Sequence, residues 1–456
     1  MEEKKEIKKE YRRFWCDITC SWQCYRCGRI FKPYAIYQAT GGAPGMGMLA
    51  WIIGGLASIF AALTFAEISV LIPKTGGMVA CLSEVYSPKV GFLAGWMQTV
   101  IFYPAFLAGY GVKVGTELAV YLGNQFALPI AMLVIMSLVA FNILGSKTAS
   151  RIQIVFTICK LIPLFLLMIF GFVFGKGGNP VFKPMVAEGK DIGAVLGSTL
   201  LAVLFAFEGW TNIGAIAGEM KNPKKDLPRA IVGGVSIIMF VYFVINIAYL
   251  WVIPADELMA LESPASAVAV KIFGNVGGLL IKLGIIISVI GAANGFLMSG
   301  SRVAYLLAKE KSIPLSNSFN QINDNGVPDN SIILIGVIAC IFSISGRFDM
   351  LTDLAVFSCW VFYTLSFMAV ITYRQRYPEL KRDYKVPLYP VIPLLAIFSG
   401  LYVILSQMFL SGKTATIMAL LSIGVTLLGL PVWYISKRYY AKHLIGKAND
   451  NYIKKK

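Results

Sequence analysis

Long apolar stretches separated by short polar segments dominate this chain. Each stretch approaches the 20 or so residues that a helix needs to cross roughly 30 Å of hydrocarbon. The stretches are continuous, as in Ile231–Val252, whereas the strands of a membrane barrel alternate apolar and polar positions over about 10 residues. We therefore predict a bundle of transmembrane helices. The eleven expected spans lie near residues 47–69, 92–121, 129–145, 153–175, 194–216, 230–252, 276–306, 330–346, 350–373, 390–411 and 415–435.

The distribution of basic residues predicts how the bundle is oriented. The chain is 57% hydrophobic and carries a formal net charge of +17. When the polar segments are assigned alternately to the two sides, one set holds 29 Lys and Arg residues and the other holds 6. Because basic segments resist translocation, the richer set, which includes both termini, is expected to be cytoplasmic in a plasma membrane. The positive charge thus indicates topology in a lipid bilayer, and we expect no nucleic-acid partner.

Histidine usage argues against catalysis inside the bundle. His443 is the single histidine and lies in the basic C-terminal segment. A Ser-His-Asp or Cys-His catalytic set therefore has no histidine within the apolar spans. A zinc site that relies on histidine lacks its ligand for the same reason. We expect neither an enzyme nor a cofactor or metal.

The segment Phe14–Ile30 departs from the apolar pattern. It reads FWCDITCSWQCYRCGRI and holds four of the eight cysteines. Close cysteine spacing can indicate a tetrahedral zinc site. The genetic code offers an alternative, because the codons for Phe14–Gly28, read one nucleotide later, can spell FGAISLAVGSVIGAG. We favour the hypothesis of a frameshifted first transmembrane helix, and we expect the chain in this form to transport poorly.

Long motifs from Gly41 onward carry a resemblance to a known family. They are ALTFAEISVLIPKTGG (Ala62–Gly77), FAFEGW (Phe205–Trp210), GEMKNPKKDLPRAI (Gly218–Ile231), ISVIGAANGFLMSGSRVAY (Ile287–Tyr305) and FSCWVFYTL (Phe357–Leu365). In these motifs, and over about nine-tenths of its length, the chain resembles the amino acid–polyamine–organocation permeases. The L-type amino acid transporter and serine/threonine exchanger branch is the most similar.

The resemblance implies an all-α, LeuT-like fold with nominally twelve helices, the first ten forming two inverted five-helix repeats. In that fold, helices one and six are broken at mid-membrane and bind substrate there. A broken helix exposes N–H groups at a start and C=O groups at an end, which suit the carboxylate and the ammonium of an amino acid. We expect residues 1–35 to be a basic tail with the disrupted first helix, 36–436 a single transporter domain, and 437–456 a cytoplasmic tail.

The motif FAFEGW supplies the expected break in the sixth helix. Gly209 can leave helical geometry at little cost, and Glu208 at membrane depth costs roughly 2.5–3.5 kcal/mol on insertion scales. The alternative is a glycine packing contact beside a structural, protonated glutamate. The resemblance places the substrate's amine and gating aromatics here. Glu208, Gly209, Phe205 and Phe207 are therefore candidate substrate-binding residues, with Phe205 as a lid, although both phenylalanines could equally be lipid-facing.

Four more polar or aromatic positions are candidates in other spans. Lys160 needs an acid, carbonyls or water in the fifth helix; it could replace the metal ion of sodium-coupled relatives, or its ammonium could reach the interface. Asn294 and Ser299 in the eighth helix could contact substrate or bond to neighbouring helices. Tyr363 in the tenth helix is interpreted as a packing residue, with a gate as the alternative.

These observations predict a secondary transporter that moves small neutral L-amino acids by alternating access, as an exchanger or a proton symporter. Glu208 keeps a cationic amino acid or polyamine open as an alternative substrate. A non-transporting amino-acid sensor of the same fold is a second alternative, weakened because no signalling domain is attached. No accessory subunit is indicated, since no cysteine in an expected outer loop suggests a covalent partner.

Overall fold

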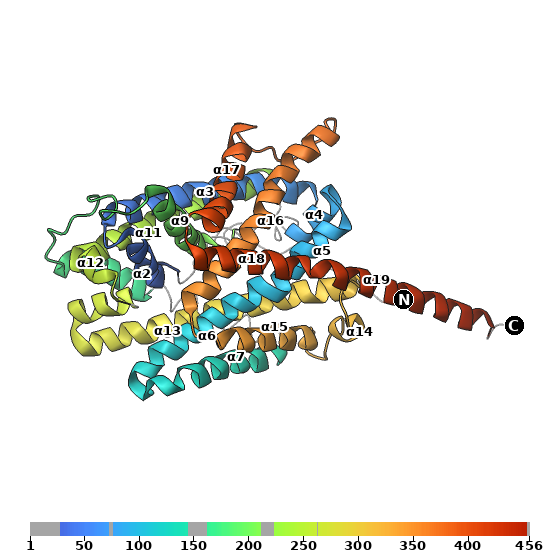
Figure 1. The fold of residues 1–456 in the computed structure, drawn as a ribbon, viewed down its shortest axis with the longest axis horizontal. Coiled ribbons are helices and arrows are strands. Elements are labelled where there is room, and N and C mark those ends of the chain that lie inside the picture. Colours follow the sequence, from blue (N-terminus) through green and yellow to red (C-terminus); the bar gives the residue numbers. More distant parts are fainter. Residues whose placement is uncertain (1–27, 73–75, 145–161, 211–222, 262, 454–456) are drawn as a thin grey trace.

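The computed structural model describes residues 28–72, 76–144, 162–210, 223–261 and 263–453 (Figure 1). Within these residues the chain forms helices and connecting loops and contains no β-strand. Eight helical segments there are long and apolar enough to cross a membrane, and three shorter apolar helices accompany them. Each of the apolar stretches expected from the sequence overlaps one of these segments. The prediction of an all-α, multi-pass membrane protein is confirmed.

The helices follow one another along the chain. The first group is α2 (Gly28–Thr40), α3 (Pro44–Leu71), α4 (Met78–Val85), α5 (Pro88–Met97), the π-helix η1 (Gln98–Phe102), α6 (Tyr103–Leu122), the 3₁₀ turn η2 (Asn124–Phe126) and α7 (Ala127–Ile143). The second is the helix Ile162–Phe174, α9 (Ile192–Phe207), α11 (Pro223–Val252), α12 (Ala255–Leu258) and α13 (Pro264–Lys309). The third is α14 (Ser316–Phe319), α15 (Asp329–Ser343), α16 (Phe348–Arg376), α17 (Val391–Phe409), α18 (Lys413–Leu427) and α19 (Gly429–Ile453).

The short helix α2 is packed inside the bundle against α9 and α3. Its side chains Lys32, Ile36 and Tyr37 are at most 1% exposed. The loop before α9 covers the C-terminal end of α2, where Ala187 N–H donates to the carbonyl of Thr40 at 3.0 Å. Helix α2 runs across residue 35 and α19 runs across residue 436. Neither expected domain boundary therefore falls in a loop.

A buried ion pair fixes α3 against α16, and both helices pack on α9. The carboxylate of Glu67, 1% exposed at its side chain, accepts hydrogen bonds from Arg374 Nε at 2.7 Å and Nη2 at 2.5 Å. It also accepts one from Val386 N–H at 2.7 Å. A buried carboxylate is tolerated when its charge and its acceptor capacity are both met. This network fixes the register of α3 against α16, and both helices contact α9.

Candidate functional site

Helix α9 ends inside the FAFEGW motif. It begins at the N-cap Asp191, whose side chain accepts a hydrogen bond from Ala194 N–H at 2.7 Å. Its last helical residue is Phe207, after which Glu208 adopts φ −57° and ψ 142°. Gly209 follows with φ +120°, a conformation that glycine adopts far more readily than other residues. The helix ends where the sequence predicts its break, and residues 211–222 lie outside the described residues.

Glu208 is buried at this helix end, with 1% of its surface exposed. Its Oε1 accepts a hydrogen bond from the hydroxyl of Tyr363 in α16 at 2.5 Å. The Tyr363 ring also packs on Trp210, with ring centroids 4.7 Å apart. The sequence interpretation favoured a packing role for Tyr363 over a gate and did not predict this contact. A carboxyl group beside the partial negative charge of a helix C-terminus makes a site suited to an ammonium group.

Phe205 and Phe207 lie on opposite sides of α9, because two residues correspond to about 200° of rotation. Phe205 is fully buried and stacks on Phe106 of α6, with centroids 5.4 Å apart and an interplanar angle of 11°. Phe207 contacts Trp51 and Tyr242, at centroid distances of 6.2 and 5.3 Å. Both rings are buried by neighbouring helices. The alternative of lipid-facing side chains is therefore wrong, and the role of Phe205 as a lid remains a prediction.

Two of the other predicted site residues, Asn294 and Ser299, lie on α13. Asn294 of α13 accepts a hydrogen bond from Asn142 of α7 at 2.7 Å, which is the helix-bonding alternative. Ser299 is partly buried on the same helix. Lys160 lies outside the described residues. Substrate contact by Asn294 or Ser299 therefore remains a prediction.

Lys32 is a residue of the site region that the sequence interpretation missed. Its ammonium lies 2.9 Å from a carboxylate oxygen of Asp349 and 2.9 Å from one of Asp353, both in α16. It also donates to the Thr352 hydroxyl at 3.1 Å and lies 5.0 Å from the centroid of the Phe205 ring. The available signal was Asp353 itself, because an acid inside an apolar span requires a partner.

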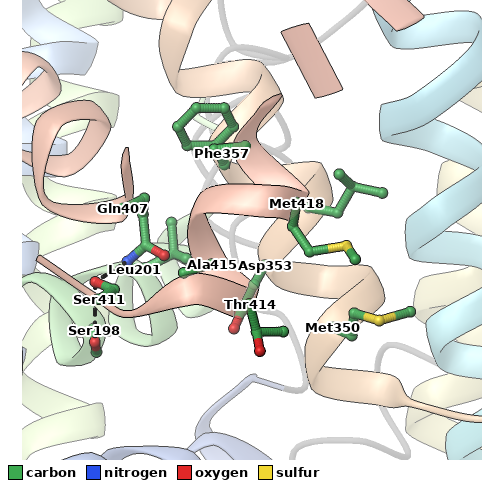
Figure 2. Close-up of a pocket in the computed structure, with 12 residues that line it drawn as sticks. Ser198, Leu201, Met350, Asp353, Phe357, Gln407, Ser411, Thr414, Ala415 and Met418 are labelled. Atoms are coloured by element: carbon green, nitrogen blue, oxygen red, sulfur yellow. Dashed lines mark hydrogen bonds between the residues drawn. The ribbon is translucent and has the colours of Figure 1, made fainter. Parts of the chain in front are cut away.

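A cavity of about 280 Å³ opens beside this cluster, between α9, α16, α17 and α18 (Figure 2). Asp353 forms part of its wall. Ser198 and Gln407 both donate to the Ser411 hydroxyl, at 3.3 and 3.2 Å. Apolar side chains complete the lining, including Leu201, Met350, Leu354, Phe357 and Met418. The cavity is thus largely apolar with one acidic corner.

The fold and the interrupted helix define a multi-pass helical membrane protein of the transporter class. A profile of the family described as "Amino acid permease" matches residues 25–433. The chain is 36% identical over 415 residues to the serine/threonine exchanger SteT of Bacillus subtilis, covering 90% of this chain and 93% of that one. It is 28% identical to the human cystine/glutamate transporter, over 90% of this chain and 81% of the relative. The human b(0,+)-type amino acid transporter 1 is 29% identical, over 83% and 78%.

The chain belongs to the amino acid permease family, because the profile covers far more than half of its length. This confirms the resemblance seen in the sequence motifs. Membership defines the protein as a carrier of amino acids rather than an enzyme.

Proposed function

We propose that this permease carries small neutral L-amino acids by alternating access, with the substrate's α-ammonium bound at the end of α9. The observation that carries the proposal is the buried Glu208 carboxyl, held by Tyr363 at 2.5 Å where the helix stops. Helix carbonyls and the carboxyl oxygen together favour an ammonium. Helix α2 begins at Gly28 and packs against α9. The N–H groups exposed at the break of the first helix in the family fold, before α2, are the proposed partners of the substrate's carboxylate.

Exchange of small neutral amino acids is favoured over the other modes. A relative matched over 93% of its own length is a serine/threonine exchanger, which supports serine-sized substrates and exchange. A cationic amino acid or polyamine is the alternative substrate, supported by the acidic side chains near Phe205. The excess of basic residues in one set of loops supports a plasma-membrane location with both termini in the cytoplasm.

Residues 14–27 lie outside the described structure, and they contain most of the segment proposed to be frameshifted. The family profile begins to match at residue 25, which supports a loss of family sequence before that point. We therefore define a restored chain in which Phe14–Gly28 is replaced by FGAISLAVGSVIGAG. It is made with and without Arg29, because the codons do not determine where the frame returns.

The test is uptake of radiolabelled serine into proteoliposomes, with and without unlabelled serine preloaded inside. Exchange predicts uptake that requires the preload, whereas proton symport predicts uptake driven by an inward proton gradient in empty vesicles. We expect the restored chain to exceed the chain as it stands by at least about tenfold, which corresponds to about 1.4 kcal/mol. Equal uptake by both would refute the frameshift hypothesis. Saturable serine binding without uptake by either chain would favour a sensor.

A further inference from the structure

Lys32 occupies a complete binding site for an ammonium group. Two carboxylates, Asp349 and Asp353, each lie 2.9 Å from its Nζ, and the Thr352 hydroxyl lies at 3.1 Å. The rings of Phe205 and Phe348 lie with their centroids 5.0 and 5.6 Å from the same nitrogen. Carboxylates and aromatic faces both bind alkylammonium groups. We call these five residues the ammonium cage.

The charges within the cage do not balance. One ammonium faces two carboxylates, so the cluster carries a formal charge of −1. The Lys32 side chain is 0% exposed, whereas those of Asp349 and Asp353 are 38% and 40% exposed. A lysine that served only to neutralise one aspartate would not need the second carboxylate or the aromatic faces. The cage therefore resembles a ligand site that the chain fills with its own side chain.

The cage and the proposed substrate site share one wall. Phe205 contacts the ammonium of Lys32 and lies three residues before Glu208, which corresponds to roughly 4.5 Å of helical rise. When the α-ammonium of a substrate is bound at Glu208, its side chain can point toward Phe205 or away from it. A cationic side chain directed toward Phe205 would meet the Lys32 ammonium and be repelled by it.

Asp353 also provides a route to the cage. Its side chain belongs both to the cage and to the wall of the cavity of about 280 Å³ (Figure 2). A small amine that enters the cavity therefore meets the acidic corner directly. The remaining wall is largely apolar and suits a short alkyl chain.

We propose that Lys32 acts as a built-in substitute for the cationic side chain of a substrate, and that its presence restricts this permease to amino acids with uncharged side chains. The second part rests on the proposed function, whereas the existence of an alkylammonium site does not. Lys32 is then a specificity-determining residue. Removing its side chain would let the ammonium group of lysine, ornithine or a short amine enter the cage.

The first test uses n-propylammonium, which replaces the atoms that Lys32→Ala deletes. The purified full-length variant is melted in detergent with increasing amine. At ten times the dissociation constant, the folded-to-unfolded ratio should rise about elevenfold, and the rise should saturate. The wild type, whose cage is filled, should not respond. If Lys32→Ala is recovered folded only when the amine is present during purification, that result also supports the proposal.

Three controls separate the cage from general effects. The triple variant Lys32→Ala/Asp349→Asn/Asp353→Asn keeps the cavity but loses the charge, so the amine should not stabilise it. Lys282→Ala removes another buried lysine, 3.0 Å from Glu117, and should not respond, because Lys113 still pairs with that carboxylate at 3.2 Å. Neutral n-propanol should not replace the amine. An equal response of wild type and Lys32→Ala, or an equal effect of n-propanol, would overturn the proposal.

The second test measures selectivity in the restored chain by uptake of labelled ornithine and serine. Lys32→Ala should raise the ratio of ornithine to serine uptake by at least about tenfold, and the triple variant should return it to the wild-type value. Serine uptake by Lys32→Ala with an unchanged ratio would refute the selectivity role. If no version with Lys32 takes up serine, the proposed function fails instead, and the propylammonium experiment still decides whether the cage binds an amine.

Discussion

Replacing Tyr363 with phenylalanine removes a single hydroxyl from the candidate site. The hydroxyl donates to Glu208 Oε1 at 2.5 Å, and the ring contacts with Trp210 and Trp360, at 4.7 and 6.0 Å between centroids, are retained. A hydrogen bond to a charged group contributes about 1.5–3 kcal/mol. Each 1.4 kcal/mol corresponds to tenfold in affinity. If that contact aims the carboxyl group at the substrate's ammonium, Tyr363→Phe should weaken apparent serine affinity about 10- to 100-fold.

The assay is the concentration dependence of serine uptake by the restored chain in preloaded proteoliposomes. Tyr402→Phe is the matched control, because that hydroxyl donates at 2.9 Å to the carbonyl of Gly193 at the opposite end of α9. It should leave the apparent affinity within about threefold, which is under 1 kcal/mol. An unchanged affinity in Tyr363→Phe would show that Glu208 does not need this hydroxyl, and would remove the main support for an ammonium site there.

Three further changes test other parts of the argument. Gly209→Ala in the restored chain places a side chain at φ +120°, which costs about 1–2 kcal/mol, and should abolish serine uptake while the purified protein stays folded. Uptake equal to that of the restored chain would show that the break is not needed. Glu67→Ala leaves Arg374 without its buried carboxylate and should lower the free energy of unfolding by about 3–5 kcal/mol, so an unchanged denaturation midpoint would contradict it. In a double-mutant cycle, Asn142→Ala and Asn294→Ala should show a coupling of about 0.6–1.7 kcal/mol in stability, and no coupling would contradict the helix-bonding role. A weaker serine affinity in Asn294→Ala would support its predicted substrate contact.

The spans and the helix break were predictable because both depend on local sequence. An apolar stretch of about 20 residues has few alternatives to a transmembrane helix, and a glycine next to a charged residue inside such a stretch indicates an interruption. The contacts that organise the site were not predictable in the same way. Tyr363 and Glu208 are 155 residues apart, and Lys32 and Asp353 are 321 apart, so no local pattern connects them.

The sequence alone indicates that Asp353 needs a partner inside the membrane. It lies inside the predicted span 350–373, where an unpaired carboxylate is costly. That position alone required a cationic or hydrogen-bonding partner. The pairing itself still needed the fold, because it depends on the Lys32 ammonium of α2 lying beside Asp353 of α16 and Phe205 of α9. Charge inside a span thus predicts that a partner exists without naming it.

The proposed disruption of the first helix and the intact cage are compatible, because the cage begins after the disrupted segment. Contacts with other elements hold helix α2 in place. Lys32 is bound by two carboxylates, and Thr40 accepts a hydrogen bond from Ala187 N–H. None of these contacts involves residues 14–27. A change confined to those residues therefore removes half of the substrate cradle while leaving the partners of α2 intact. Loss of transport with retention of the fold is the expected combination, and it makes restoring that segment a test of function separate from stability.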